Sequence, residues 1–163
     1  MTNTNYKTIA SKIKFEGRAF INGKYVDAID GKKFETINPA TGETLCSVAK
    51  CNSKDVDLAV KVSRKAFNSG VWSRTSPEFR KDILLKFAEL LRVHGVENSV
   101  LECIDTGKLI GDCINEVAND APMHFQWYGE LIDKVFGKVG PTEPSLTSLI
   151  VKEPIGVVAG VVP

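Results

Sequence analysis

The sequence predicts an α/β fold in which short strands and helices border a parallel sheet. Three observations support this prediction. The first fifty residues alternate short apolar stretches with turn dipeptides, and from residue 53 to residue 136 apolar side chains recur at intervals of three and four, the period of a helix. Residues 156–162 then form an unbroken apolar run, and a strand without a polar face is typical of the buried centre of a parallel sheet.

Composition and charge exclude several classes of protein. The chain has 163 residues, of which 43% are hydrophobic and 25% charged, as in an ordinary globular domain. Its 21 basic and 20 acidic residues nearly cancel, so we expect neither a nucleic acid nor a membrane as partner. The first residues lack a secretory signal and no apolar run is long enough to span a bilayer, which predicts a cytoplasmic location.

The first third of the chain is predicted to form small strands after a flexible leader over residues 1–17. Residues 18–26 place apolar side chains on both sides of Asn22-Gly23, the dipeptide that most favours a type I′ hairpin turn. Two further strands are predicted at residues 34–37 and 44–48, and residues 38–42 are predicted to form the turn between them.

Three helices are predicted next. Ser53 is a suitable N-cap, acidic residues follow it in the first turn, and the apolar period continues to about residue 68. Ser76-Pro77 begins a second helix that ends near His94. A third helix is expected over residues 96–105.

A longer helical pattern covers residues 110–136, and Pro122 is expected to kink it or to divide it in two. Gly137 closes this segment. Residues 146–151 are predicted to pair as an antiparallel strand with the stretch around residues 138–139, before the apolar run begins behind Pro154.

Catalytic constellations are scarce in this sequence, and no catalytic residue is predicted. The two histidines lie thirty residues apart on different predicted helices, where structural roles account for them. The glycines of the apolar run do not form a Gly-x-Gly-x-x-Gly dinucleotide motif. The four cysteines have neither zinc-site spacing nor a context that would activate a thiol, so we expect reduced, small hydrophobic side chains at Cys46, Cys51, Cys103 and Cys113.

Three acidic residues leave alternatives open. Glu116 and Asp120 lie four residues apart on a predicted helix, so they share a face that could meet a cationic substrate group, although a solvated face is the commoner role of such a pair. Asp105 follows a helix beside Thr106-Gly107 and could offer oxygen ligands to a cation or simply form a turn, and the sequence favours the turn.

Five short motifs occur in an order and spacing that resemble the N-terminal part of the NAD(P)-dependent aldehyde dehydrogenases. They lie at residues 20–23, 38–43, 101–108, 127–129 and 153–163. Leu109 departs from the pattern, because the family usually has Pro there. Residues 127–137 look most similar to the aminoaldehyde branch, which includes γ-glutamyl-γ-aminobutyraldehyde dehydrogenases.

The resemblance implies the N-terminal part of the aldehyde dehydrogenase fold. Residues 18–137 would be the hairpins and helices of the cofactor-binding domain, residues 138–153 an oligomerisation hairpin, and residues 154–163 the first strand of a truncated, Rossmann-like nucleotide-binding sheet. The implied activity is oxidation of aldehydes to carboxylates with NAD or NADP through a cysteine thiohemiacetal. In the family the nucleophile, the general base and the main cofactor motif follow the position of Pro163, so the chain alone is expected to be inactive.

The resemblance also implies several peripheral site residues. Val161, Val162 and Pro163 would line the cofactor cleft. Thr36, Ile37 and Asp105 would hold a structural monovalent cation. We hypothesise further that Glu116 or Asp120 faces the substrate mouth and favours a cationic or polar aldehyde.

The partners implied by the resemblance are a small-molecule aldehyde and, in the full-length protein, further copies of the same subunit. One alternative is a non-catalytic assembly or binding module that pairs with full-length subunits.

Overall fold

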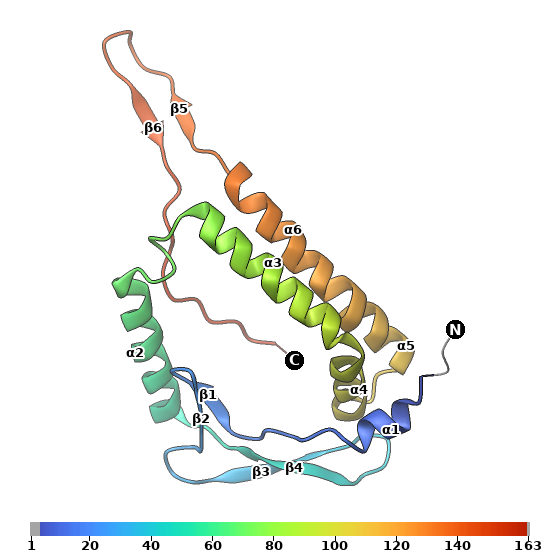
Figure 1. Cartoon of the computed structure of the whole chain (residues 1–163). Helices are drawn as coiled ribbons and strands as arrows, with labels where there is room; N and C mark the ends of the chain where they lie inside the picture. The colour runs from blue at the N-terminus through green and yellow to red at the C-terminus, as the bar shows by residue number, and fades with distance from the viewer. Residues whose placement is uncertain (1–3, 163) are drawn as a thin grey trace.

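The computed structural model describes residues 4–162. Helices and three separate two-stranded antiparallel sheets make up this part of the chain (Figure 1). The strands are β1 (Ala19–Ile21), β2 (Lys24–Val26), β3 (Lys33–Ile37), β4 (Thr44–Ala49), β5 (Lys138–Gly140) and β6 (Ser148–Ile150). The helices are α1 (Tyr6–Ala10), α2 (Ser53–Ser69), α3 (Pro77–Val93), α4 (Gly95–Thr106), α5 (Ile110–Cys113), the π-helix η1 (Ile114–Asp120), α6 (Ala121–Leu131) and the 3₁₀ helix η2 (Ile132–Lys134).

The predicted hairpins form with the expected turn chemistry. β1 pairs antiparallel with β2, and the turn between them places Asn22 at φ 56° and Gly23 at φ 75°. Positive φ at both central residues is the requirement of a type I′ turn, and it explains why Asn-Gly stands there. β3 pairs with β4 through a register shift at Thr36 and Ile37, so that strand is bulged near its end. The β5–β6 hairpin projects away from the helices (Figure 1).

The sequence predicts a flexible leader over residues 1–17, and the structure instead places helix α1 in it, against α4. The side chain of Asn5 caps α1 by accepting a hydrogen bond from the Thr8 N–H at 3.1 Å. The carbonyl of Gly17 accepts a hydrogen bond of 2.7 Å from the Ala49 N–H, so the leader continues along the edge of β4. A short helix of this kind carries too few apolar positions to be recognised from periodicity.

A buried carboxylate organises the start of α2. The sequence predicts Ser53 as the N-cap, but the cap is Asn52, whose side chain accepts a hydrogen bond of 2.8 Å from the Lys54 N–H. Asp55 returns the bond by accepting from the Asn52 N–H at 2.8 Å, which completes a capping box. Its second oxygen accepts from the Ile29 N–H at 2.9 Å, so this side chain, only 2% exposed, also fixes the loop before β3.

Helices α3 and α6 lie side by side and form the main helical contact (Figure 1). The rings of Phe87 and Phe125 meet edge to face with centroids 4.7 Å apart. A Cβ atom placed on Gly129 would come within 3.1 Å of Leu84, so the two helices approach closely. Below them, a Cβ atom on Gly95 would lie 2.8 Å from the Cβ of Ala118, which shows that α4 crosses η1 at a distance that only glycine allows.

The long helical pattern over residues 110–136 is divided into α5, η1, α6 and η2. Pro122 is expected to kink or divide this segment, and the π-helix ends at Asp120, two residues before the proline. The hydrogen bond from the Ala121 N–H to the Glu116 carbonyl spans five residues, the spacing of a π-helix. Because proline has no N–H to donate, the change of helix type falls where one hydrogen bond is missing in any case.

The assignment of residues 154–163 to the first strand of a larger sheet stays a prediction, because the described residues contain no neighbouring strand for this run. Residues 151–162 make no ladder with another segment of the described chain, and Gly156 has φ 116°. A strand exists only through hydrogen bonds to a neighbour. The side chains of this run are accordingly among the most exposed apolar groups of the molecule, at 97% for Val161.

The described core is small for a chain of this length. Its buried hydrophobic residues all have modest volumes and are Ala28, Ala49, Ala88, Val100 and Cys113. The solvent-accessible surface is 12573 Å². A compact monomer of this mass would expose roughly 8,000 Å². The chain therefore exposes about 1.6 times that area, and large apolar side chains account for much of its surface.

Candidate functional site

A hydrogen bond joins two of the three residues that the resemblance assigns to a cation. The hydroxyl of Thr36, on β3, donates to Asp105 Oδ1, near the end of α4, at 3.0 Å. Ile37 follows on β3, at its bulge. The turns behind these residues also touch, since a Cβ atom on Gly107, at φ 76°, would lie 2.7 Å from the ring of Pro39. The fold thus brings together two side chains that are 69 residues apart in the sequence.

The chemistry of this junction suits a hard cation only in part. Carboxylate and hydroxyl oxygens are ligands of the right type, and Asp105 keeps a second oxygen outside its bond to Thr36. Two such side chains are too few for a complete ligand set. In the region from residue 4 to residue 162, no group of three or more His, Cys, Asp or Glu could hold a metal ion. Backbone oxygens would have to supply the remaining ligands.

Glu116 is already paired with a cation of the protein itself. The Lys108 Nζ lies 2.5 Å from Glu116 Oε2. This hydrogen bond raises the pKa of the Lys108 ammonium above its usual range, so the lysine stays charged beside the carboxylate. Both groups are partly exposed. Glu116 therefore offers little uncompensated negative charge.

Asp120 has the opposite electrostatic setting. It is exposed at the end of η1, and its carboxylate has no hydrogen-bond or ion-pair partner among residues 4–162. Only its backbone carbonyl is engaged, at 2.8 Å from Nδ1 of His124. The two acidic residues lie in a π-helix and not in the α-helix that the sequence predicts, and their environments differ. A cationic ligand approaching η1 would meet the free charge of Asp120 first.

The residues that the resemblance assigns to the cofactor cleft stand in the extended run after β6. Val161 and Val162 are 97% and 82% exposed, and Pro163 lies outside the described residues. Both valines lie in a segment that forms neither helix nor strand. The run carries no glycine-rich phosphate turn followed by a helix. The described residues do not by themselves fit a dinucleotide.

The four cysteines are free thiols, and in two of them the pKa is shifted away from what a nucleophile requires. Cys113 is buried, and burial raises the pKa of its thiol. The pKa of the Cys51 thiol is also raised, chiefly because the sulfur is desolvated. A reactive cysteine needs the opposite shift, toward thiolate at neutral pH. Cys46 and Cys103 are half-buried.

The sequence does not predict the ion pair between Lys108 and Glu116. Lys108 and Glu116 are eight residues apart and separated by a turn, so no helical spacing predicts their contact. Asp55 is different, because the pattern Asn52-x-x-Asp55 is a capping-box signature that could have identified its partner.

Comparison with known proteins decides which family has this arrangement of hairpins and helices. A model of the family described as "Aldehyde dehydrogenase family" matches residues 25–163. The chain belongs to the aldehyde dehydrogenase family. The α/β fold is confirmed by this match and by solved structures that superpose on the same region.

The similar aldehyde dehydrogenases include enzymes named for amino-substituted aldehydes. The chain is 40% identical over 163 residues to the aminoacetaldehyde dehydrogenase of Pseudomonas aeruginosa, covering 100% of this chain and 33% of that protein. A γ-glutamyl-γ-aminobutyraldehyde dehydrogenase from Burkholderia cenocepacia superposes with TM-score 0.85 and 41% identity, over 88% of this chain and 29% of that one.

A structure with bound cofactor is also similar. The indole-3-acetaldehyde dehydrogenase AldA of P. syringae, in complex with NAD+ and IAA, has TM-score 0.89 and 38% identity over 93% of this chain and 30% of that one. This aldehyde dehydrogenase chain therefore spans about a third of the length of its relatives. In the part that the structure describes, no helix is both long and apolar enough to cross a bilayer.

Proposed function

We propose that this chain is the N-terminal part of an NAD(P)-dependent aldehyde dehydrogenase acting in the cytoplasm. The overall reaction converts an aldehyde, water and oxidised cofactor into a carboxylate and reduced cofactor. The observation that supports this most strongly is the family match from residue 25 to residue 163, together with the superposition on a structure that contains NAD+. In this proposal Val161 and Val162 lie at the edge of a cofactor cleft formed largely by residues outside this chain.

The chain alone is proposed to be inactive. The two thiols with perturbed pKa values are shifted toward the protonated form, so neither suits nucleophilic attack at neutral pH. The purified 163-residue chain, mixed with aldehyde and NAD+ or NADP+, should give no increase in the absorbance of reduced cofactor. Aminoacetaldehyde dehydrogenase of Pseudomonas aeruginosa serves as the positive control. Turnover by the short chain would refute the proposal of inactivity.

A chimera tests the family function directly. This chain replaces the matching third of the Pseudomonas aeruginosa enzyme, to which it is 40% identical. We expect the chimera to fold, to bind cofactor and to oxidise aldehydes. A chimera that elutes as a folded oligomer and binds NAD+ yet oxidises no aldehyde would contradict the proposed function.

The substrate class is proposed to be aldehydes that carry a positive charge. The names of two relatives refer to amino-substituted aldehydes. Of the two acidic residues on η1, Asp120 is the better candidate for the substrate mouth, because Lys108 already neutralises Glu116. In the chimera, Asp120→Asn should raise KM for aminoacetaldehyde and leave KM for an uncharged aldehyde unchanged. The matched control is the double variant Lys108→Gln/Glu116→Gln, which removes both charges of the ion pair and should have little effect on either.

Thr36, Ile37 and Asp105 are proposed to contribute to a monovalent cation site. The Thr36–Asp105 hydrogen bond supports this by holding two oxygen-bearing side chains together at the junction of β3 and α4. Potassium should then raise the melting temperature of the chimera relative to choline at equal ionic strength, and Asp105→Asn should abolish the difference. Equal melting temperatures in both salts would argue against a cation.

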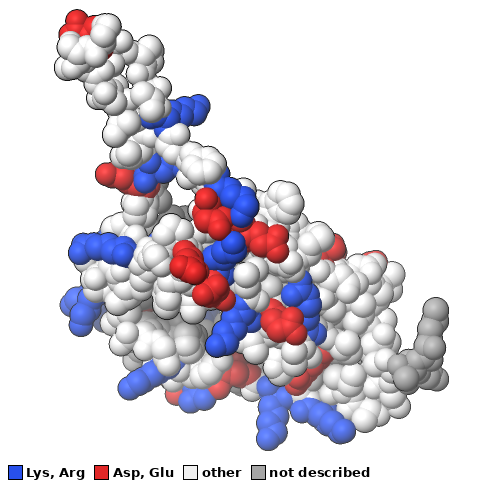
Figure 2. Space-filling view, turned by 45° about the horizontal axis from the view of Figure 1, so that its top comes forward, with Lys and Arg blue, Asp and Glu red and all other residues white. Residues whose placement is uncertain are grey.

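We propose that the β5–β6 hairpin takes part in the assembly of subunits. Its apolar side chains are exposed, with Val139 at 73% and Leu149 at 66%. Figure 2 shows the hairpin mostly uncharged between its acidic tip and its charged base, whereas basic and acidic side chains gather together over the middle of the visible face. We assign residues 138–153 to a subunit contact of the full-length homo-oligomer. The alternative of a non-catalytic assembly module predicts that the free chain enters oligomers of full-length subunits, which co-purification would detect.

A further inference from the structure

Two cysteines approach each other where the chain turns from α4 into α5. Cys103 lies near the end of α4 and Cys113 at the end of α5, and these two helices pack against each other (Figure 1). The Ser99 hydroxyl, a hydrogen-bond donor on α4, lies 3.1 Å from the carbonyl oxygen of Cys113. Because Cys103 follows Ser99 by four residues, both side chains project from the same face of α4. Cys103 therefore lies on the face that α5 covers.

The turn between the two helices also contacts both cysteines. The Gly107 N–H donates a hydrogen bond of 3.0 Å to the Cys103 carbonyl. The Cys113 thiol donates a weak hydrogen bond of 3.9 Å to the carbonyl of Lys108, the next residue of the same turn. Burial raises the pKa of the Cys113 thiol, and the neighbouring Cys103 raises it further, which requires that the two sulfurs lie close together.

These contacts depend on nothing outside residues 95–113. Cys113 is 0% exposed and Cys103 is half-buried. The other two cysteines are closer in sequence but are held apart, because Cys46 lies on β4 and Cys51 follows the end of that strand. The extended chain from Cys46 to Ala49 alone spans about 10 Å, which is more than a disulfide bridges. The fold thus favours one particular pair of thiols.

We propose that Cys103 and Cys113 form a dithiol that hydrogen peroxide oxidises to a disulfide within one chain. The Cys103 sulfur attacks a peroxide oxygen, the O–O bond breaks, and a sulfenic acid and water form. The Cys113 sulfur then attacks the Cys103 sulfur, the S–O bond breaks, and the hydroxide leaves as water with the proton of the Cys113 thiol. Two thiols are thereby oxidised, and one peroxide is reduced to two waters. Cys103 reacts first because Cys113 is fully buried.

The disulfide would close a ring over residues 103–113. The ring contains Asp105, which contacts Thr36, and Lys108, which pairs with Glu116. Oxidation would therefore restrict the segment that carries both contacts. Disulfides in a reducing cytoplasm are usually transient or redox-sensing, so we expect the link to be reversible by a thiol reductant. This inference goes beyond aldehyde oxidation and does not require it.

Peptide mapping tests the pair directly. The purified 163-residue chain is treated with hydrogen peroxide in buffer, its free thiols are alkylated, and it is digested with trypsin. Cleavage after Lys108 places Cys103 in peptide 93–108 and Cys113 in peptide 109–134, each with a single cysteine. We expect these two peptides to appear joined, with a mass lower by two hydrogen atoms than their sum. Absence of the joined pair after peroxide treatment would overturn the proposal.

The same treatment in urea is the control for the fold. In an unfolded chain the Cys46–Cys51 disulfide should be at least as abundant as the Cys103–Cys113 disulfide, because the shorter loop costs less entropy to close. In buffer the Cys103–Cys113 link should exceed the Cys46–Cys51 link by at least about tenfold, since the fold brings only the first pair together. Equal proportions of the two links in buffer and in urea would overturn the proposal.

Single substitutions test the order of the two steps. In Cys113→Ala, no second thiol resolves the sulfenic acid at Cys103, so a 1,3-diketone reagent should label that residue after peroxide treatment. Cys103→Ala is the matched variant and should give little label at the buried Cys113. Equal labelling of both variants would overturn the assignment of Cys103 as the sulfur that reacts first.

Discussion

The Lys108 ammonium lies 2.5 Å from Glu116 Oε2 and holds that carboxylate on the side of η1 that faces the turn after α4. Because of this contact, the carboxylate of Glu116 is less available to a cationic ligand than the carboxylate of Asp120. It also makes Lys108 a positioning residue, because it acts on any ligand of η1 through Glu116. Removing the lysine should release a second negative charge.

Replacing Lys108 by Gln in the chimera should lower KM for a cationic aldehyde by about two- to fivefold, since exposed ion pairs of this kind contribute little individually. Adding Glu116→Gln to that variant should restore the original KM. Steady-state kinetics with an uncharged aldehyde of equal length provide the control. An identical change for both aldehydes would indicate a structural role of Lys108 and no electrostatic one.

Asp55→Ala should destabilise the chain by about 2–4 kcal/mol, because the N–H groups of Ile29 and Asn52 lose a buried acceptor. Urea unfolding followed by circular dichroism measures the effect. Asp57→Ala removes an exposed carboxylate from the same helix and should change the free energy of unfolding by less than about 0.5 kcal/mol. Equal effects of the two substitutions would contradict the role assigned to Asp55.

Gly95→Ala should destabilise the contact between α4 and η1 by about 1–3 kcal/mol, because the new methyl group would lie 2.8 Å from the Cβ of Ala118. Gly111→Ala is the matched control, since a Cβ atom there meets nothing within 4 Å. Alanine is also the better helix former, so this variant should be neutral or slightly stabilised. In thermal melts, the melting temperature should therefore fall for Gly95→Ala and stay unchanged or rise slightly for Gly111→Ala.

Asp133 makes stability depend on pH in the acid range. Hydrogen bonds from Lys134 and Lys81 lower the pKa of its carboxyl from 3.8 to about 2. The folded state thus favours the charged form, and the resulting stabilisation is present above pH 3.8 and is lost as the pH falls through about 2. Asp133→Asn should lower the melting temperature at neutral pH, and the difference from the unsubstituted chain should vanish near pH 2. A constant difference down to that pH would argue against the ion pairs.

Much of the fold follows from local sequence signals. The boundaries of α2, α3 and α4 lie within a residue or two of those predicted from periodicity and caps, and Asn22-Gly23 specifies its own turn through backbone preference. Helix α1 is missed because one short turn carries no period. The π-helix is missed because proline signals a break without determining which hydrogen bonds replace the lost one.

The site is less predictable than the fold. Thr36 and Asp105 are 69 residues apart, so no local pattern predicts their contact. Only the family resemblance assigns them to the same site. Long side chains such as Lys108 reach partners that no spacing rule identifies. The apolar run after Pro154 has the composition of a strand, but pairing depends on a neighbour, and residues 4–162 supply none.

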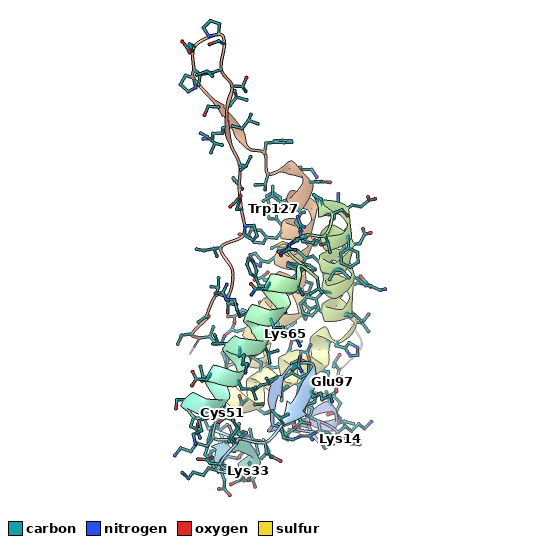
Figure 3. All side chains as sticks on the ribbon, turned by 90° about the vertical axis from the view of Figure 1, so that its left-hand side faces the viewer. Lys14, Lys33, Cys51, Lys65, Glu97 and Trp127 are labelled. Atoms are coloured by element: carbon teal, nitrogen blue, oxygen red, sulfur yellow. The ribbon has the colours of Figure 1, made fainter. Side chains whose placement is uncertain are left out.

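The chain contains two tryptophans, and the fold gives each a different neighbourhood. Trp72 lines a cleft together with residues 156–158, and Trp127 lies on α6, 63% exposed, toward the β5–β6 hairpin (Figure 3). Replacing one of them by Phe leaves a single fluorophore that reports on one surface only. A blue shift in the emission of Trp72 alone would then show optically that α2 and its cleft have become covered, while an unchanged Trp127 spectrum would show that the hairpin side is still in water.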